Sequence, residues 1–108
     1  MPAAKIDLSS FMTDTANTIT TALGFISDAQ KAQKAAADKC ARVLAPATLG
    51  ASEASSAKAI FQNVDIQQDA VVAAGLDPSK IFGGLLNHAS ILAQSAKDRL
   101  IDAGAAAA

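Results

Sequence analysis

The chain has 108 residues, with nine Lys or Arg and ten Asp or Glu, so its net charge near neutral pH is −1. This balance excludes the long-range positive field that attracts proteins to nucleic acids or acidic membranes. Apolar residues make up 51% of the chain, but 27 of them are alanines, and neither Trp nor Tyr is present. A buried alanine contributes much less than the roughly 1.5–3 kcal/mol of a buried leucine or phenylalanine. Because alanine is also the best helix former, the composition predicts long helices around a narrow core.

A first long helix is predicted over residues 8–44, where apolar and small residues recur at steps of four and three. This spacing presents one continuous stripe to a neighbouring helix. Asp7 is placed to cap the first turn, and Pro46 disfavours helical geometry in the residue before it. Such a helix spans roughly 55 Å at 1.5 Å per residue. Either it breaks near Gly24 or the molecule is elongated, and the uninterrupted stripe favours elongation.

Residues 45–52 are predicted to connect this helix to a second one over residues 53–74. Ser52 would cap the second helix, with Glu53 close to the positive end of its dipole. Gly75 is expected to end the second helix in the left-handed conformation, which glycine adopts without steric cost.

A third helix is predicted over residues 78–103, with Asp77 as its cap and Pro78 in the first helical position. The adjacent Gly83 and Gly84 predict weak first turns, with either a kink or a later start, because glycine is a poor helix former. Residues 104–108 form an alanine-rich tail.

No segment alternates between apolar and polar residues as a half-buried strand does, so the predicted fold class is all-α. The chain is expected to form a single helical domain over residues 1–108, with a long N-terminal helix and two shorter helices. The simplest architecture for three such stripes is an elongated helical hairpin or three-helix bundle.

The sequence shows no arrangement of residues that predicts catalysis, a cofactor or a metal site. His88 is the sole histidine and has no carboxylate three or four residues away, whereas a metal site normally has three or four ligands. Cys40 is the sole cysteine and lies in the apolar stripe, which favours a buried small residue over a nucleophile. The prediction is a non-enzymatic protein with no cofactor and no nucleic-acid partner.

The longest uncharged stretch, residues 81–96, falls short of the ~20 predominantly apolar residues that span a bilayer. The first residues also lack the apolar core of a cleavable signal. The location is not specified by the sequence beyond an expectation of cytoplasmic synthesis followed by assembly into a particle.

The alanine-rich helix faces predict a structural subunit that packs with copies of itself or with another helical protein, as in a virion, a filament or a secretion apparatus. The predicted interface consists of Leu8, Met12, Ile19, Ala22, Ile26, Ala29, Ala36, Cys40, Val43, Phe61, Phe82, Leu85 and Leu92. One alternative is a helical protein-binding module, such as a chaperone, an inhibitor or a secreted effector. A second, less favoured alternative is a membrane-active helical protein that acts through residues 81–96.

Overall fold

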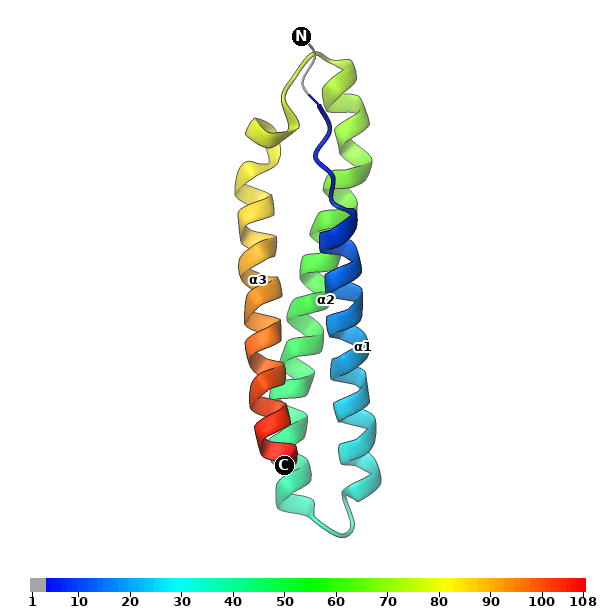
Figure 1. Cartoon of the computed structure of the whole chain (residues 1–108), viewed down its shortest axis with the longest axis vertical. Coiled ribbons are helices and arrows are strands. Elements are labelled where there is room, and N and C mark those ends of the chain that lie inside the picture. Colours follow the sequence, from blue (N-terminus) through cyan, green and yellow to red (C-terminus); the bar gives the residue numbers. More distant parts are fainter. Residues whose placement is uncertain (1–3) are drawn as a thin grey trace.

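A computed structural model describes residues 4–108 as an elongated three-helix bundle (Figure 1). Helix α1 covers Ser9–Ala32, α2 covers Ala37–Ala73 and α3 covers Pro78–Ala107, and there is no strand within residues 4–108. The molecule measures 62 × 17 × 15 Å. The prediction of an all-α, elongated three-helix fold is therefore confirmed.

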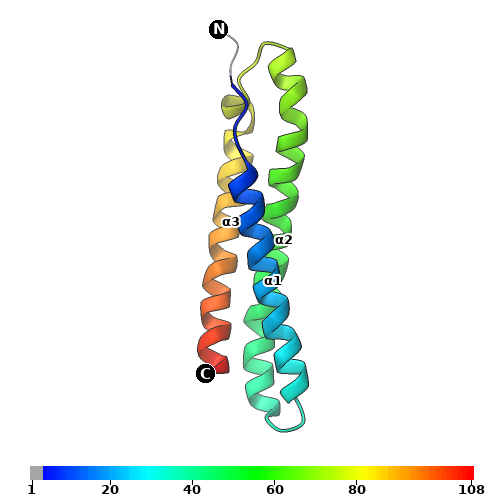
Figure 2. The same ribbon diagram turned by 45° about the vertical axis from the view of Figure 1, so that its right-hand side comes forward.

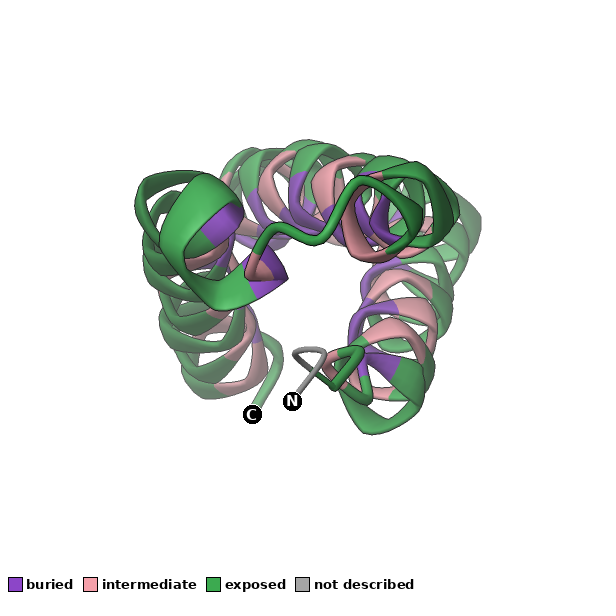
Figure 3. Ribbon diagram, turned by 90° about the horizontal axis from the view of Figure 1, so that it is seen from above, coloured by how far each residue is buried: buried purple, intermediate pink, exposed green. Residues whose placement is uncertain are grey.

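Consecutive helices are antiparallel, and α2 is the central element of the bundle (Figures 1 and 2). It packs extensively against both α1 and α3, whereas α1 and α3 contact each other much less. Seen along the rod, the three helices form an open arc, and their buried positions face the side that they share (Figure 3).

The predicted single helix over residues 8–44 is wrong, because the chain reverses direction at residues 33–36. The amides of Ala35 and Ala36 both donate to the carbonyl of Ala32, at 3.1 and 3.0 Å, and Ala36 leaves helical geometry with φ −151°. The residues of this turn are good helix formers, so no local signal predicts it. The reversal lets the apolar side of α1 pack against α2, which an isolated rod would leave in water.

The predicted connection at residues 45–52 is also wrong, because α2 continues through it and through Pro46. Proline inside a helix removes a backbone hydrogen bond and crowds the preceding turn, at a cost of about 3 kcal/mol. The residues that follow Pro46 offset this cost by tight packing: Ala47 is fully buried, and Gly50 lies directly against α3. Ser52 is accordingly an interior helix residue, not a cap, and Glu53 pairs with Arg99 of α3.

The turn between α2 and α3 matches its prediction in detail. Gly75 has φ +78°, its amide donates to the carbonyl of Val72 at 2.9 Å, and the next amide donates to Val71 at 3.0 Å. This pair of hydrogen bonds satisfies carbonyls at the end of α2. Asp77 then caps α3 by accepting hydrogen bonds from the amide and hydroxyl of Ser79 at 3.1 and 2.8 Å. Helix α3 runs unbroken through Gly83 and Gly84 and continues past its predicted end at residue 103.

The core consists of two clusters separated by a narrow waist of alanines. The upper cluster, near the α2–α3 turn, consists of Leu8, Ala57, Phe61, Val64, Phe82 and Ala89. The lower cluster, near the α1–α2 turn, consists of Ala29, Cys40, Val43, Ala47 and Ala103. At the waist, Ala22, Ala54 and Ala96 are fully buried. At Gly50, one turn from Ala54, α2 lies so close to α3 that a Cβ there would be 3.2 Å from the carbonyl oxygen of Ala96.

Candidate interaction surfaces

Most residues of the predicted interface lie inside the bundle. Seven are buried: Leu8, Ala22, Ala29, Cys40, Val43, Phe61 and Phe82. Five are partly buried: Met12, Ile19, Ile26, Ala36 and Leu92. Leu85 is the one exposed member, with half of its surface accessible. The stripe that the sequence marks for helix packing is thus used largely between helices of the same molecule.

Gln68 holds the N-terminal arm, residues 4–8, against the upper cluster. Its side chain is fully buried, and its Nε2 donates to the carbonyl of Ile6 at 3.0 Å while its Oε1 accepts from the amide of Ile6. Both polar ends of the side chain are therefore satisfied, as burial requires. Leu8 completes the attachment by inserting into the upper cluster. Gln68 stands seven residues after Phe61 and four after Val64 in the sequence, and a lone amide on the apolar side of a helix is a signal for such a buried hydrogen bond.

Two charged contacts flank the arm at the molecular surface. Lys5 pairs with Asp69, and this hydrogen bond, together with the attraction between the charges, raises the pKa of Lys5 above its ordinary 10.5. Asp7 accepts hydrogen bonds from the hydroxyl and amide of Ser9 at 2.6 and 3.0 Å, which lowers the pKa of Asp7 below its ordinary 3.8. The N-cap position of α1 is Leu8, not the predicted Asp7, but Asp7 does accept a hydrogen bond from the amide of Ser9, the first residue of the helix.

An apolar surface lies along the outside of the α2–α3 pair, and we call it the outer face. Leu85 of α3 and Ile60, Asn63, Val64 and Gln67 of α2 line a shallow hollow of about 170 Å³ on it. Ile81 and Leu92 fall on the same side of α3 as Leu85, four residues before it and seven after it. About half of the surface of Ile81 and of Leu85 is accessible.

The α3 side of the outer face has charged residues only at its two ends. Helix α3 has no Asp, Glu, Lys or Arg between Lys80 and Lys97. At the lower end of the face, Nε of Arg99 lies 3.3 Å from Oε1 of Glu53, which joins α3 to α2. The result is a strip that has no Asp, Glu, Lys or Arg on its α3 side, combines apolar side chains with the amides of Asn63 and Gln67, and ends at charged residues.

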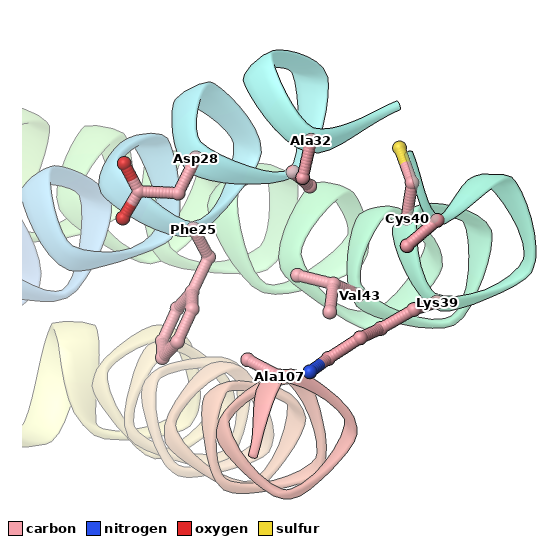
Figure 4. A pocket seen from close by; sticks show the side chains of 9 residues that line it. Phe25, Asp28, Ala32, Lys39, Cys40, Val43 and Ala107 are labelled. Carbon is pink, nitrogen blue, oxygen red and sulfur yellow. The ribbon is translucent and has the colours of Figure 1, made fainter. Parts of the chain in front are cut away.

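A second hollow, the end hollow, lies at the lower end of the rod between residues of α1, α2 and α3 (Figure 4). Its volume is about 330 Å³. It is lined by Phe25, Asp28, Ala29, Ala32, Ala36, Lys39, Cys40, Val43 and Ala107. Lys39 extends toward Ala107 on one side, and Asp28 lies on the other (Figure 4). The sequence could not indicate this hollow, because its walls come from three helices whose ends were not predicted correctly.

Within residues 4–108, no three His, Cys, Asp or Glu side chains lie close enough together to hold a metal ion. His88 is exposed on α3, and Cys40 is a buried free thiol, as predicted. None of the helices in this part of the chain is long and apolar enough to cross a membrane.

No family model, curated protein or solved structure matches the chain. The geometry and chemistry of the two surfaces therefore provide the basis for a functional proposal.

Proposed function

We propose that this chain is a non-enzymatic structural subunit that associates side by side with copies of itself through the outer face. A virion, a filament or a secretion apparatus would use such a rod. The observation that carries the proposal is the uncharged strip in which Ile81 and Leu85 are half exposed beside Ile60 and Leu92. Single exposed apolar residues are common on protein surfaces, but contiguous ones favour a contact with another protein.

The dimensions of the rod favour lateral association over end-to-end association. A full side of 62 × 17 Å gives a flat area of roughly 1,000 Å², which exceeds the ~800 Å² per partner of a stable interface. An end of 17 × 15 Å gives only roughly 250 Å², which falls far below it. A stable contact between copies therefore requires the long side of the molecule.

The alanine stripe that the sequence suggested as the contact between copies lies inside the monomer, so another surface must make that contact. Small residues on the stripe of α1 and α2 serve the close packing of the monomer, as the full burial of Ala22, Ala54 and Ala57 indicates. Of the predicted interface residues, Leu85 and Leu92 belong to the outer face. Association is accordingly assigned to the outer α2–α3 surface in place of the first predicted helix.

Sedimentation velocity tests this proposal over protein concentrations from about 1 to about 100 μM. The wild-type protein should form larger species as the concentration rises, and Leu85→Lys should remain monomeric. Ile101→Lys is the matched control, because Ile101 is more exposed than Leu85 (69% against 50%) and lies about 160° around α3 from it. It should associate like the wild type.

A wild-type protein that stays monomeric throughout this range would overturn the proposal. The helical protein-binding module would then be the better assignment. Equal loss of association in Leu85→Lys and Ile101→Lys would instead show that the outer face is not the contact. Circular dichroism of both variants verifies that each substitution leaves the helices intact.

A further inference from the structure

We propose that the N-terminal arm, residues 4–8, exchanges between neighbouring copies of this chain. The arm of one copy then occupies the arm site of the next, which we define as Gln68, Asp69 and the upper cluster. Exchange rests on the proposed association through the outer face, because that contact holds two copies side by side. It adds to that function the segment that each copy contributes to its partner, and it requires the copies to be parallel.

The arm is bound mainly by α2 and α3, although it leads directly into α1. The amide and the carbonyl of Ile6 are both hydrogen-bonded to the fully buried side chain of Gln68. Lys5 pairs with Asp69, and Leu8 inserts into the upper cluster. The carbonyl of Leu8 is the only backbone group of the arm that is hydrogen-bonded to α1.

The same contacts are available on a second copy. The two hydrogen bonds of Ile6 join residues that are 62 positions apart in the sequence. A segment that is held by distant parts of its own chain finds identical partners on an identical chain, which makes exchange a low-cost route to association. The rearrangement is confined to the junction of the arm with α1, where Leu8 has φ −101° and ψ 3° and is not helical.

The arm site adjoins the outer face. Val64 belongs to the upper cluster that receives Leu8, and it also lines the hollow of the outer face. Ile60 packs against the same cluster and lines the same hollow. A copy that docks on the outer face therefore lies next to the arm site, and its own arm is present there at a high local concentration.

The length of the arm determines how the two copies are oriented. Five residues span at most about 17 Å when they are fully extended. This reach matches the 17 Å width of the rod and is far below its 62 Å length. The arm lies at the upper end of the rod (Figure 1), so it reaches a neighbour whose upper end lies beside its own. It does not reach the arm site of a neighbour that points the other way.

Cross-linking of isotope-mixed wild-type protein tests the exchange. Heavy-isotope-labelled and unlabelled protein are mixed in equal amounts at about 100 μM and treated with a carbodiimide, which joins an amine to a carboxylate in contact with it. Mass spectrometry should find Lys5–Asp69 linkages between differently labelled chains, because the arm of one copy lies on the arm site of another. The matched control is the pair of Asp14 and Lys97, an exposed ion pair between α1 and α3 whose linkages should stay within one chain.

Mixed-label linkages should be at least severalfold more frequent for Lys5–Asp69 than for Asp14–Lys97. They should disappear in Leu85→Lys and persist in Ile101→Lys. Equal mixing at the two pairs, or no mixing at Lys5–Asp69 in a wild-type protein that sediments as larger species, would overturn the exchange and leave the association proposal standing. A wild-type protein that is monomeric by sedimentation would instead overturn both.

Discussion

The two ends of the rod are packed in different ways. The upper cluster is built from large side chains, with Phe61 stacked on Phe11 at a centroid distance of 5.2 Å and Leu8 brought in by the N-terminal arm. The lower cluster is built mainly from alanines, Cys40 and Val43, and it leaves the end hollow open. Small residues let helices approach closely, but their side chains fill little of the space between helices at the lower end. Side chains of the upper cluster are therefore expected to contribute more to the free energy of unfolding than those of the lower cluster. The lower end is expected to expose more apolar surface.

The largest effect should come from removing a large side chain at the upper end. Phe61→Ala deletes a ring that is almost completely buried and should lower the free energy of unfolding by about 3–5 kcal/mol. Cys40→Ala at the lower end should cost about 1 kcal/mol, because it removes one small atom beside an existing hollow. Urea denaturation measures both values. Equal costs would contradict the difference between the two clusters.

The next largest loss of stability should come from breaking the attachment of the N-terminal arm. Gln68→Leu keeps the apolar contacts but leaves the amide and carbonyl of Ile6 without their partner, so it should cost about 1–3 kcal/mol. Gln62→Leu, on an exposed position of the same helix, should stay within about 0.5 kcal/mol of the wild type. Thermal unfolding gives the stabilities, and hydrogen exchange at Ile6 reports the arm directly. Unchanged protection of Ile6 in Gln68→Leu would show that the arm is held by other contacts.

Replacing glycine by alanine should change the stability in opposite directions at two positions. One, Gly50, lies in the close-packed waist, and the other, Gly84, lies at the surface. A Cβ at Gly50 would lie 3.2 Å from the carbonyl oxygen of Ala96 and 3.3 Å from Arg99 Cβ, so Gly50→Ala should destabilise the fold by about 1–3 kcal/mol. A Cβ at Gly84 would meet nothing, so Gly84→Ala should stabilise α3 by about 0.5–1 kcal/mol. Melting temperatures of the two variants give the signs, and a shift in the same direction would contradict the close approach at Gly50.

The smallest effects should be the pH responses of the exposed contacts at the upper end. The pKa of Asp7 is lowered in the folded protein, so its contribution is complete above its ordinary 3.8 and is lost as the pH falls through the lower folded value. The pKa of Lys5 is raised, so its contribution is complete below 10.5 and is lost as the pH rises through the higher folded value.

Amide exchange in residues 4–8 should therefore increase relative to the lower end below about pH 4 and above about pH 10.5. Asp7→Asn should remove the acid part of this response and leave the alkaline part. If amide exchange in Asp7→Asn still increased below about pH 4, the acid response would come from another carboxylate.

The candidate surfaces show how far sequence reasoning reaches. Leu85, predicted as an interface residue from its helical spacing, lines the hollow of the outer face, whereas Leu92, predicted in the same way, is partly buried and packs against the upper cluster. The end hollow was not predicted, because it depends on the turn between α1 and α2, which falls inside the single helix predicted there. The arm contact was not predicted either, because Gln68 and Ile6 are far apart in the sequence and meet only after the helices have packed.

By itself the sequence determined the helical class, the narrow alanine core and the turn at Gly75 and Asp77, because each depends on residue propensity or on hydrogen bonds within a few positions. Only the tertiary structure decided that the chain reverses at residues 33–36 and that α2 continues through Pro46. At residues 33–36, residues that favour a helix form a turn, because the reversal buries the apolar side of α1. At the second, a proline is tolerated because Ala47 and Gly50 pack against neighbouring helices. In both cases burial over a whole helix outweighs a local preference of a few residues.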